Sequence, residues 1–149
     1  MCRGERHPSG NPDLLPVPGT LQGDPGHLFL SRVDGIYAAA MAWLVCGDRV
    51  LASLEIADSS RARRRGLLRR DGIEGALLLR PANSVHTVGM RFAIDVAHLD
   101  ADLRVLRTST MARHRVGRPV PGARAVVEAD AGSFERWGLA VGDELEVRE

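Results

Sequence analysis

Short apolar segments, separated by turn-forming residues, recur from about Met41 to the end of the chain. The first two, Ala42–Val45 and Arg49–Ala57, flank Gly47-Asp48, and such a pattern predicts a β-hairpin. By the two-residue period of a strand, four apolar residues of the second segment share one face: Val50, Ala52, Leu54 and Ile56. Further strands are expected at six segments: Ala76–Arg80, Ser84–Val88, Phe92–Leu99, Leu103–Thr108, Ala125–Ala129 and Glu144–Val147. Many short strands at regular spacing are typical of a β-sandwich or barrel.

Two short helices are expected between these strands. Asp58-Ser59-Ser60 offers side-chain oxygens that can cap the first helix, Arg61–Arg65, and Gly66 follows where a left-handed residue would end it. Asp130 can cap the second helix, Gly132–Trp137, in the same way. The pattern therefore predicts a mostly-β domain, a single small β-sandwich with two short helices, over residues 41–149.

The composition changes near residue 40. Residues 1–26 are rich in proline and glycine and have almost no periodic apolar pattern, which is typical of a disordered segment. Residues 27–40 hold a short apolar patch without a partner segment. Residues 1–40 are interpreted either as a flexible N-terminal extension or as sequence upstream of a translation start at Met41.

Composition and charge narrow the functional classes. The formal net charge is +1, so no strong field favours nucleic acid or an anionic membrane as a partner. The only cysteines, Cys2 and Cys46, form no disulfide framework or zinc spacing, which favours a reducing cytoplasm. The apolar run Ile36–Cys46 is too short to span a bilayer and lies too far along the chain for a signal peptide. We therefore expect a soluble, cytoplasmic domain.

Several short motifs resemble a known family when they are taken in order. They are Glu55-Ile56-Ala57-Asp58, Arg65-Gly66-Leu67-Leu68, the segment His86–Asp95, Val127-Glu128-Ala129, Gly132, Gly138-Leu139 and Gly142-Asp143. In this order and spacing, Met41–Arg148 resembles the bacterial and archaeal domain of unknown function 192. Many members carry Trp-Met-Lys-Asn-Thr and then Pro-Leu-Asp in the central segment. This chain has His86-Thr87-Val88-Gly89-Met90 and then Ala93-Ile94-Asp95, and it resembles the actinobacterial-type branch.

The resemblance implies a jelly-roll-like β-sandwich. It implies no activity, because no biochemical activity is established for the family. No role can be transferred for the family's tryptophan or lysine, since this chain lacks both in the central segment. The resemblance thus supports the fold much more firmly than any function.

Asp95 is the first candidate site residue. In the segment Phe92–Leu99 it shares a face with Ala93, Ala97 and Leu99, so its carboxylate is expected to be buried. A buried carboxylate needs a partner, because burial without one costs several kcal/mol. Asp95 therefore either anchors a ligand or accepts hydrogen bonds as a structural residue, with Arg65 as one candidate partner. The structural role is favoured.

Glu128 and His86 are further candidates. Two carboxylates across a cleft would suit glycosyl hydrolysis, but the sequence cannot place Glu128 near Asp95, and a glutamate on a solvent-facing strand is the commoner case. His86 could act as a base or a ligand, because its reference pKa lies near neutrality. His86, His98 and His114 lack metal-site spacing, so neither a metal nor another cofactor is expected.

The arginine run Arg61–Arg65, with Arg69-Arg70, is the strongest local charge. It has little aromatic interleaving, so a solvated helix face is favoured over nucleic-acid binding. Arg65 is the exception, because it opens the family-like Arg-Gly-Leu motif and could point inward. The run therefore contributes one candidate, Arg65, and no nucleic-acid surface.

Two functions remain from the sequence alone. The first is a non-catalytic module that binds a small polar ligand or a protein segment near Asp95, His86, Arg65 and Glu128. The second is a hydrolase-like, glycan-type enzyme that uses Asp95 with Glu128 or His86. The sequence leaves open the ligand, the presence of any catalytic activity and the oligomeric state.

Overall fold

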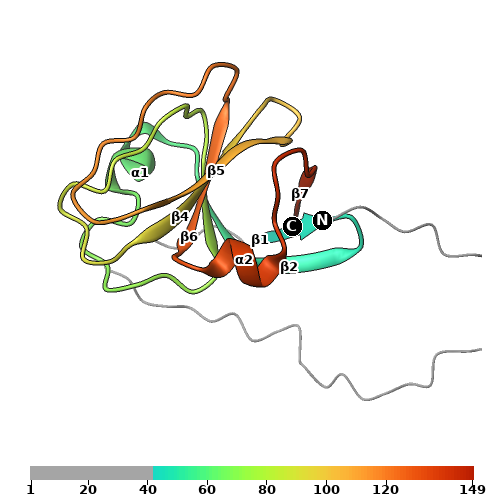
Figure 1. The fold of residues 1–149 in the computed structure, drawn as a ribbon, viewed down its shortest axis with the longest axis horizontal. Helices are drawn as coiled ribbons and strands as arrows, with labels where there is room; N and C mark the ends of the chain where they lie inside the picture. The colour runs from blue at the N-terminus through green and yellow to red at the C-terminus, as the bar shows by residue number, and fades with distance from the viewer. Residues whose placement is uncertain (1–41) are drawn as a thin grey trace, which may run out of the picture. The chain divides into compact units, whose positions relative to one another are not determined.

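Seven strands form one sheet in the computed structural model, which describes residues 42–149. The strands are β1 (Ala42–Cys46), β2 (Arg49–Ala57), β3 (Ala76–Leu79), β4 (Ile94–Leu99), β5 (Val105–Met111), β6 (Ala125–Asp130) and β7 (Leu145–Arg148). Their order in the sheet is β5-β4-β6-β3-β2-β1-β7, and all neighbours are antiparallel except β2 and β3 (Figure 1). The expected extension or translation start at residues 1–40 lies outside the described residues.

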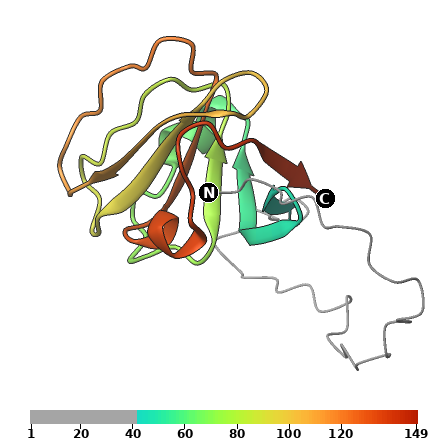
Figure 2. The ribbon, with the colours of Figure 1, turned by 45° about the vertical axis from the view of Figure 1, so that its right-hand side comes forward.

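The sheet curls so that its two ends approach each other (Figure 2). A single antiparallel bridge joins Arg104, before β5, to Glu144, before β7. Beside it, the backbone amide of Val105 donates to the carbonyl of Asp143 at 2.8 Å. The expected mostly-β domain with two short helices is thus confirmed, and the structure forms it from one curled sheet rather than from two separate sheets.

The β1–β2 hairpin around Gly47 is confirmed, but the expected face of β2 is wrong at one residue. The pairing shifts between Leu44 and Val45, so that β2 carries an extra residue at this point. Such a bulge inverts the alternation of side chains. Val50 is consequently 59% exposed, while Leu51 packs against the core in its place.

Two apolar clusters cover the two faces of the central strands. One contains Leu78, Ala97 and Val127, and the other contains Leu79, Val96 and Val126. Every residue of β4 is buried, because this strand lies between β5 and β6 and is covered on both faces. The sheet therefore has two distinct interiors, and adjacent residues of a central strand face different ones.

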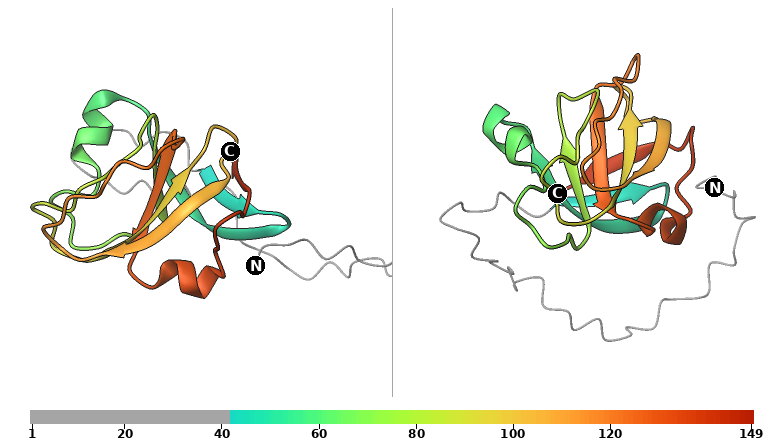
Figure 3. Two further views of the ribbon diagram at one scale, coloured as in Figure 1. Left: turned by 45° about the horizontal axis from the view of Figure 1, so that its top comes forward. Right: turned by 60° about the vertical axis from the view of Figure 1, so that its left-hand side comes forward.

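The two helices lie on opposite sides of the sheet (Figure 3). Helix α1 (Ser60–Arg65) begins as expected, because the hydroxyl of Ser59 accepts a hydrogen bond from the amide of Ala62 at 3.1 Å. Helix α2 (Ser133–Trp137) ends at Gly138 in the left-handed conformation, also as expected. No helix within residues 42–149 is long and apolar enough to cross a membrane.

The predicted strand Ser84–Val88 is wrong. This segment is a loop with one isolated bridge, between His86 and Val116. The loop is tied to residues 112–117 by Thr87, a fully buried residue whose hydroxyl accepts from the amide of Arg115 at 2.9 Å and donates to a backbone carbonyl. Backbone hydrogen bonds of Val85 and Thr87 with Gly117 and Arg115 add to these side-chain bonds, so the loop is held in place without forming a regular strand.

Candidate functional site

A pocket of about 570 Å³ lies on the sheet face covered by α1. Its walls are α1 with the turn that follows it, and the loop that carries His86. Leu79 of β3 and Glu128 of β6 line it from the sheet. The structure thus brings together three of the four candidate residues, namely Arg65, His86 and Glu128.

Glu128 is buried, contrary to the expectation of a solvent-facing strand glutamate. It lies opposite Leu77 of β3 and Val96 of β4, in the middle of the sheet, and only 4% of its surface is exposed. No group within residues 42–149 donates a hydrogen bond to its carboxyl oxygens. Burial raises the pKa of Glu128 from 4.5 to about 7, and the positive charge of Arg70 opposes this shift only in part.

The backbone of Gly66 borders the Glu128 carboxyl group. A Cβ atom at position 66 would lie 4.0 Å from Oε2 of Glu128. Gly66 ends α1 with a φ of 45°, in the range that favours glycine, and its amide donates to the carbonyl of Ala62. The helix end and the buried carboxyl group therefore meet at a residue without a side chain, which keeps the pocket open beside Oε2.

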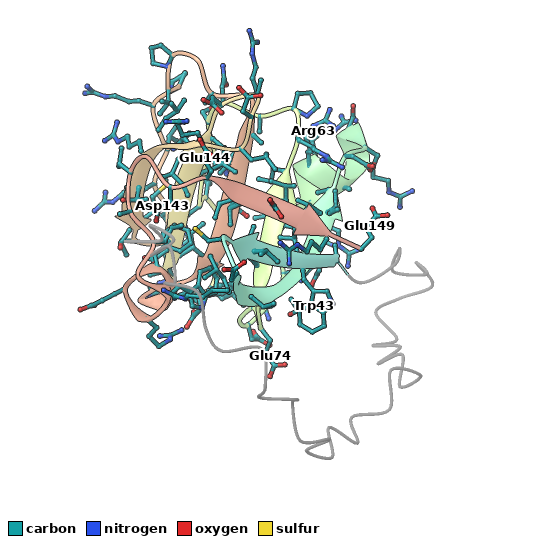
Figure 4. All side chains as sticks on the ribbon, turned by 90° about the vertical axis from the view of Figure 1, so that its right-hand side faces the viewer. Trp43, Arg63, Glu74, Asp143, Glu144 and Glu149 are labelled. Carbon is teal, nitrogen blue, oxygen red and sulfur yellow. The ribbon has the colours of Figure 1, made fainter. Side chains whose placement is uncertain are left out.

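The three arginines at the pocket differ in their partners. Arg63 is a structural clamp, because its guanidinium group donates to the carbonyls of Asp58 and Arg80 and thereby ties α1 to the end of β3 (Figure 4). Arg64 donates through Nε to the carbonyl of Ser60 at 3.3 Å. The side chain of the exposed Arg65 makes no hydrogen bond or ion pair with any residue between 42 and 149. Arg65 therefore offers a guanidinium group at the pocket that no described residue occupies.

Asp95 lies outside this pocket. On β4 it neighbours Val96, which is paired with Glu128, so the two carboxylates are on opposite faces of the sheet. Its Oδ1 accepts from the hydroxyl of Thr110 at 2.7 Å, and its Oδ2 accepts from the amides of Gly132 and Phe134, both at 3.0 Å. The expectation that Arg65 is the partner of Asp95 is therefore wrong.

The same contacts correct the expected cap of the second helix. The first residue before α2 is Gly132, which has no side chain to cap it, and Asp130 accepts no bond from α2. Asp95 supplies the oxygen from a neighbouring strand, because it lies directly opposite Ala129. Its negative charge at the start of α2 also satisfies two backbone amides that would otherwise lack partners.

His98 is a buried polar residue that was not among the candidates. It is 4% exposed, and neither ring nitrogen has a hydrogen-bond partner within residues 42–149. Burial, assisted by the nearby charge of Arg107, lowers the pKa of His98 below its ordinary value. The burial of His98 could have been predicted from the alternation of β4, because this alternation places His98 on the same face as Ile94 and Val96. Residues 42–149 contain no group of three or more side chains that could hold a metal ion.

Residues 42–149 thus form a small, mostly-β domain with one curled sheet and a pocket beneath α1 that Glu128 lines. The model of the family DUF192, described as Uncharacterized ACR, matches residues 44–147, and the chain belongs to this family. The resemblance found in the sequence motifs is thereby confirmed. No curated protein matches the chain.

Two solved structures share the fold. One is a protein of unknown function from Novosphingobium aromaticivorans DSM 12444, with 19% identity and a TM-score of 0.61 over 72% of this chain and 84% of that chain. The other is a putative transcription regulator from Sinorhizobium meliloti 1021, with 19% identity and a TM-score of 0.65 over 76% of this chain and 98% of that chain. At this identity the likeness establishes the common fold alone.

Proposed function

We propose that the domain is a binding module that takes a small polar ligand into the pocket between α1 and the His86 loop. One observation carries this proposal: Glu128 is only 4% exposed, and its carboxyl group, which borders the pocket, receives no hydrogen bond from the described residues. Buried polar groups in folded proteins are almost always hydrogen-bonded, and exceptions commonly have a functional reason. A ligand that donates a hydrogen bond would remove this deficit.

The rest of the pocket supports binding over chemistry. Besides Glu128, its polar side chains come from the tethered loop, namely Asn83, Ser84 and His86, and from α1. Convergent polar groups within a partly apolar pocket fix a ligand's orientation. Asp95, the second carboxylate that a glycan hydrolase would need, faces the other side of the sheet.

A hydrolase-like enzyme remains a second candidate in a reduced form, with Glu128 and His86 alone. The observation in its favour is that both residues line the same pocket and that the pKa of Glu128 is about 7, which suits proton transfer at neutral pH. Turnover of any ligand found to bind, followed by loss of turnover but not of binding in Glu128→Gln, would favour this enzyme over the module.

A thermal-shift screen with sugars, nucleotides, carboxylic acids and amino acids tests the binding role. A ligand at about 100 times its Kd stabilises the folded state by about 2.7 kcal/mol, which raises the Tm by several degrees. Ser84→Trp would fill the pocket and abolish the shift, whereas Ala101→Trp, on an exposed turn, would leave it intact. The absence of a shift in every class, or an equal shift in Ser84→Trp, would contradict the proposal.

A further inference from the structure

The same pocket is lined by a buried carboxyl group, on Glu128, and by an arginine, Arg65, whose side chain has no partner among residues 42–149. Glu128 lies at the sheet, beside the backbone of Gly66, and Arg65 is the residue that directly precedes Gly66. Consecutive Cα atoms are about 3.8 Å apart, so the backbone of Arg65 lies next to the residue that borders Oε2 of Glu128, and a ligand in the pocket can reach both side chains. Neither group has a hydrogen-bond partner among residues 42–149, although one is buried and the other exposed.

These two groups require opposite chemistry from a ligand. A carboxyl group that lacks donors from the protein is best matched by a ligand group with several N–H bonds, and an ammonium group supplies three such bonds and a positive charge. A free guanidinium group is best matched by a carboxylate, because its planar fork binds both oxygens together. Arg65 can bind a carboxylate without breaking an existing hydrogen bond of its side chain. Arg63 cannot, because its guanidinium group already donates to backbone carbonyls.

Part of the pocket wall is apolar. Its largest apolar side chains are Leu67, Leu68, Leu79, Val85 and Met90. Four of them are buried and belong to the apolar cluster on this face of the sheet, and Leu68 packs against that cluster. A ligand that fills the pocket must therefore carry an apolar body between or beside its charged groups.

We propose that the ligand is an amino acid with an apolar side chain, whose ammonium group binds Glu128 and whose carboxylate binds Arg65. The side chain lies against the aliphatic wall. This inference rests on the proposed binding function and names the ligand class for the same pocket. It requires no chemical step and no cofactor.

Isothermal titration with matched probes tests each group separately. L-Leucine and L-phenylalanine carry both charges, whereas 4-methylpentanoate and 3-phenylpropionate lack the ammonium group, and 3-methylbutylamine and 2-phenylethylamine lack the carboxylate. At least one amino acid is expected to bind, and its two truncated forms are each expected to bind about 30-fold more weakly or worse, because each leaves one charged group without its partner.

Variants assign the two charges to their residues. Glu128→Gln is expected to remove the advantage of leucine over 4-methylpentanoate, and Arg65→Gln to remove its advantage over 3-methylbutylamine. Arg61→Gln is the matched control, since Arg61 is an exposed arginine of the same helix that does not line the pocket. Equal losses in Arg61→Gln and Arg65→Gln would overturn the assignment of the carboxylate site.

The pH dependence of binding distinguishes two kinds of ligand group. An ammonium group would bind ionised Glu128, whereas a carboxylic acid would bind neutral Glu128. The charged and titratable groups around Glu128 are Arg63, Arg64, Arg65, Arg70, Glu55 and His86. An ammonium group needs ionised Glu128, so affinity is expected to fall roughly tenfold between pH 7 and 5.5, where leucine itself keeps both charges. Glu128→Gln should flatten this dependence, and an unchanged dependence in this variant would contradict the assignment of the ammonium group to Glu128.

The outcomes separate this inference from the binding function itself. If a sugar, a nucleotide or 4-methylpentanoate binds and depends on Glu128 while neither amino acid does, the ligand class is wrong and the binding module stands. If affinity rises as the pH falls, the ammonium assignment is likewise wrong. If no probe of any class binds, both the ligand class and the binding function fail.

Discussion

Asp95 and Glu128 are two buried carboxylates on adjacent strands, and they differ in almost everything except their exposure. Each is 4% exposed, and each lies in the middle of the same sheet. Asp95 faces α2 and receives three hydrogen bonds. Glu128 faces the pocket beneath α1 and receives none from the described residues. One residue of register decides which side of the sheet each carboxylate occupies.

The difference teaches that burial of a charge does not by itself distinguish a structural residue from a site residue. The number of donors that the fold supplies makes the distinction, because a buried acid with its donors in place stabilises the fold, and one without them is a cost. On this criterion Asp95 belongs to the scaffold, and Glu128 is the residue whose burial the fold alone does not explain. Three changes would break or sharpen the comparison.

Replacement of Asp95 has the largest expected effect. Asp95→Ala removes the acceptor of all three donors, so the free energy of unfolding is expected to fall by about 3 kcal/mol. Urea denaturation measures this loss. Thr110→Val is the control, because it removes a single bond to the same carboxylate and should cost about 1 kcal/mol. A loss below that of Thr110→Val would show that Asp95 is not the structural residue of the pair.

Replacement of Glu128 is expected to act in the opposite direction. The pKa of Glu128 is about 7 in the folded protein, and its ordinary value is 4.5. Between these two pH values the folded state binds more protons than the unfolded state. The free energy of unfolding therefore falls as the pH rises through this window. Glu128→Gln should therefore stabilise the domain by about 2 to 3 kcal/mol at pH 8 and by little at pH 4.5. Unfolding free energies measured across this range check the sign, and destabilisation at pH 8 would contradict it.

The smallest expected effect concerns His98. Its pKa is lowered by burial, so the unfolded state binds the proton first as the pH falls below 6.5, and the domain loses stability there. His98→Leu should abolish this acid-side loss and add about 1 to 2 kcal/mol at neutral pH, because it removes two buried nitrogens that have no partner among residues 42–149. The measurement is best made in Glu128→Gln, where the opposing trend is absent. An unchanged acid-side slope would assign the loss to another group.

Alternation and turn chemistry were sufficient to predict most elements of the described domain. The hairpin, both short helices and the burial of Asp95 followed from local patterns, since each depends on residues that are neighbours in sequence. The loop at Ser84–Val88 was mistaken for a strand because its alternation is genuine, while its fixing bonds come from residues nearly thirty positions away. The exposed Val50 was missed because a bulge depends on the partner strand.

The candidate site was likewise predictable from the sequence only in part. Arg65, His86 and Glu128 could be named from the sequence, but their meeting in one pocket depends on the parallel pairing of β2 with β3 and on where α1 then lies. The separation of Asp95 from Glu128 depends on the register of β4 against β6, which no local pattern encodes. Local patterns therefore indicated which residues to examine, and only non-local pairing decided which of them belong together.

The contact between the two ends of the sheet has a consequence for the behaviour of the domain in a crowded solution. Edge strands expose unpaired backbone groups and are the usual template for association between chains. Here the residues before β5 and β7 pair with each other, and an ion pair between Arg104 and Glu144 adds charge at the junction. The junction covers part of each edge without completing a barrel, so the domain limits sheet-to-sheet aggregation while the face beneath α1 stays accessible.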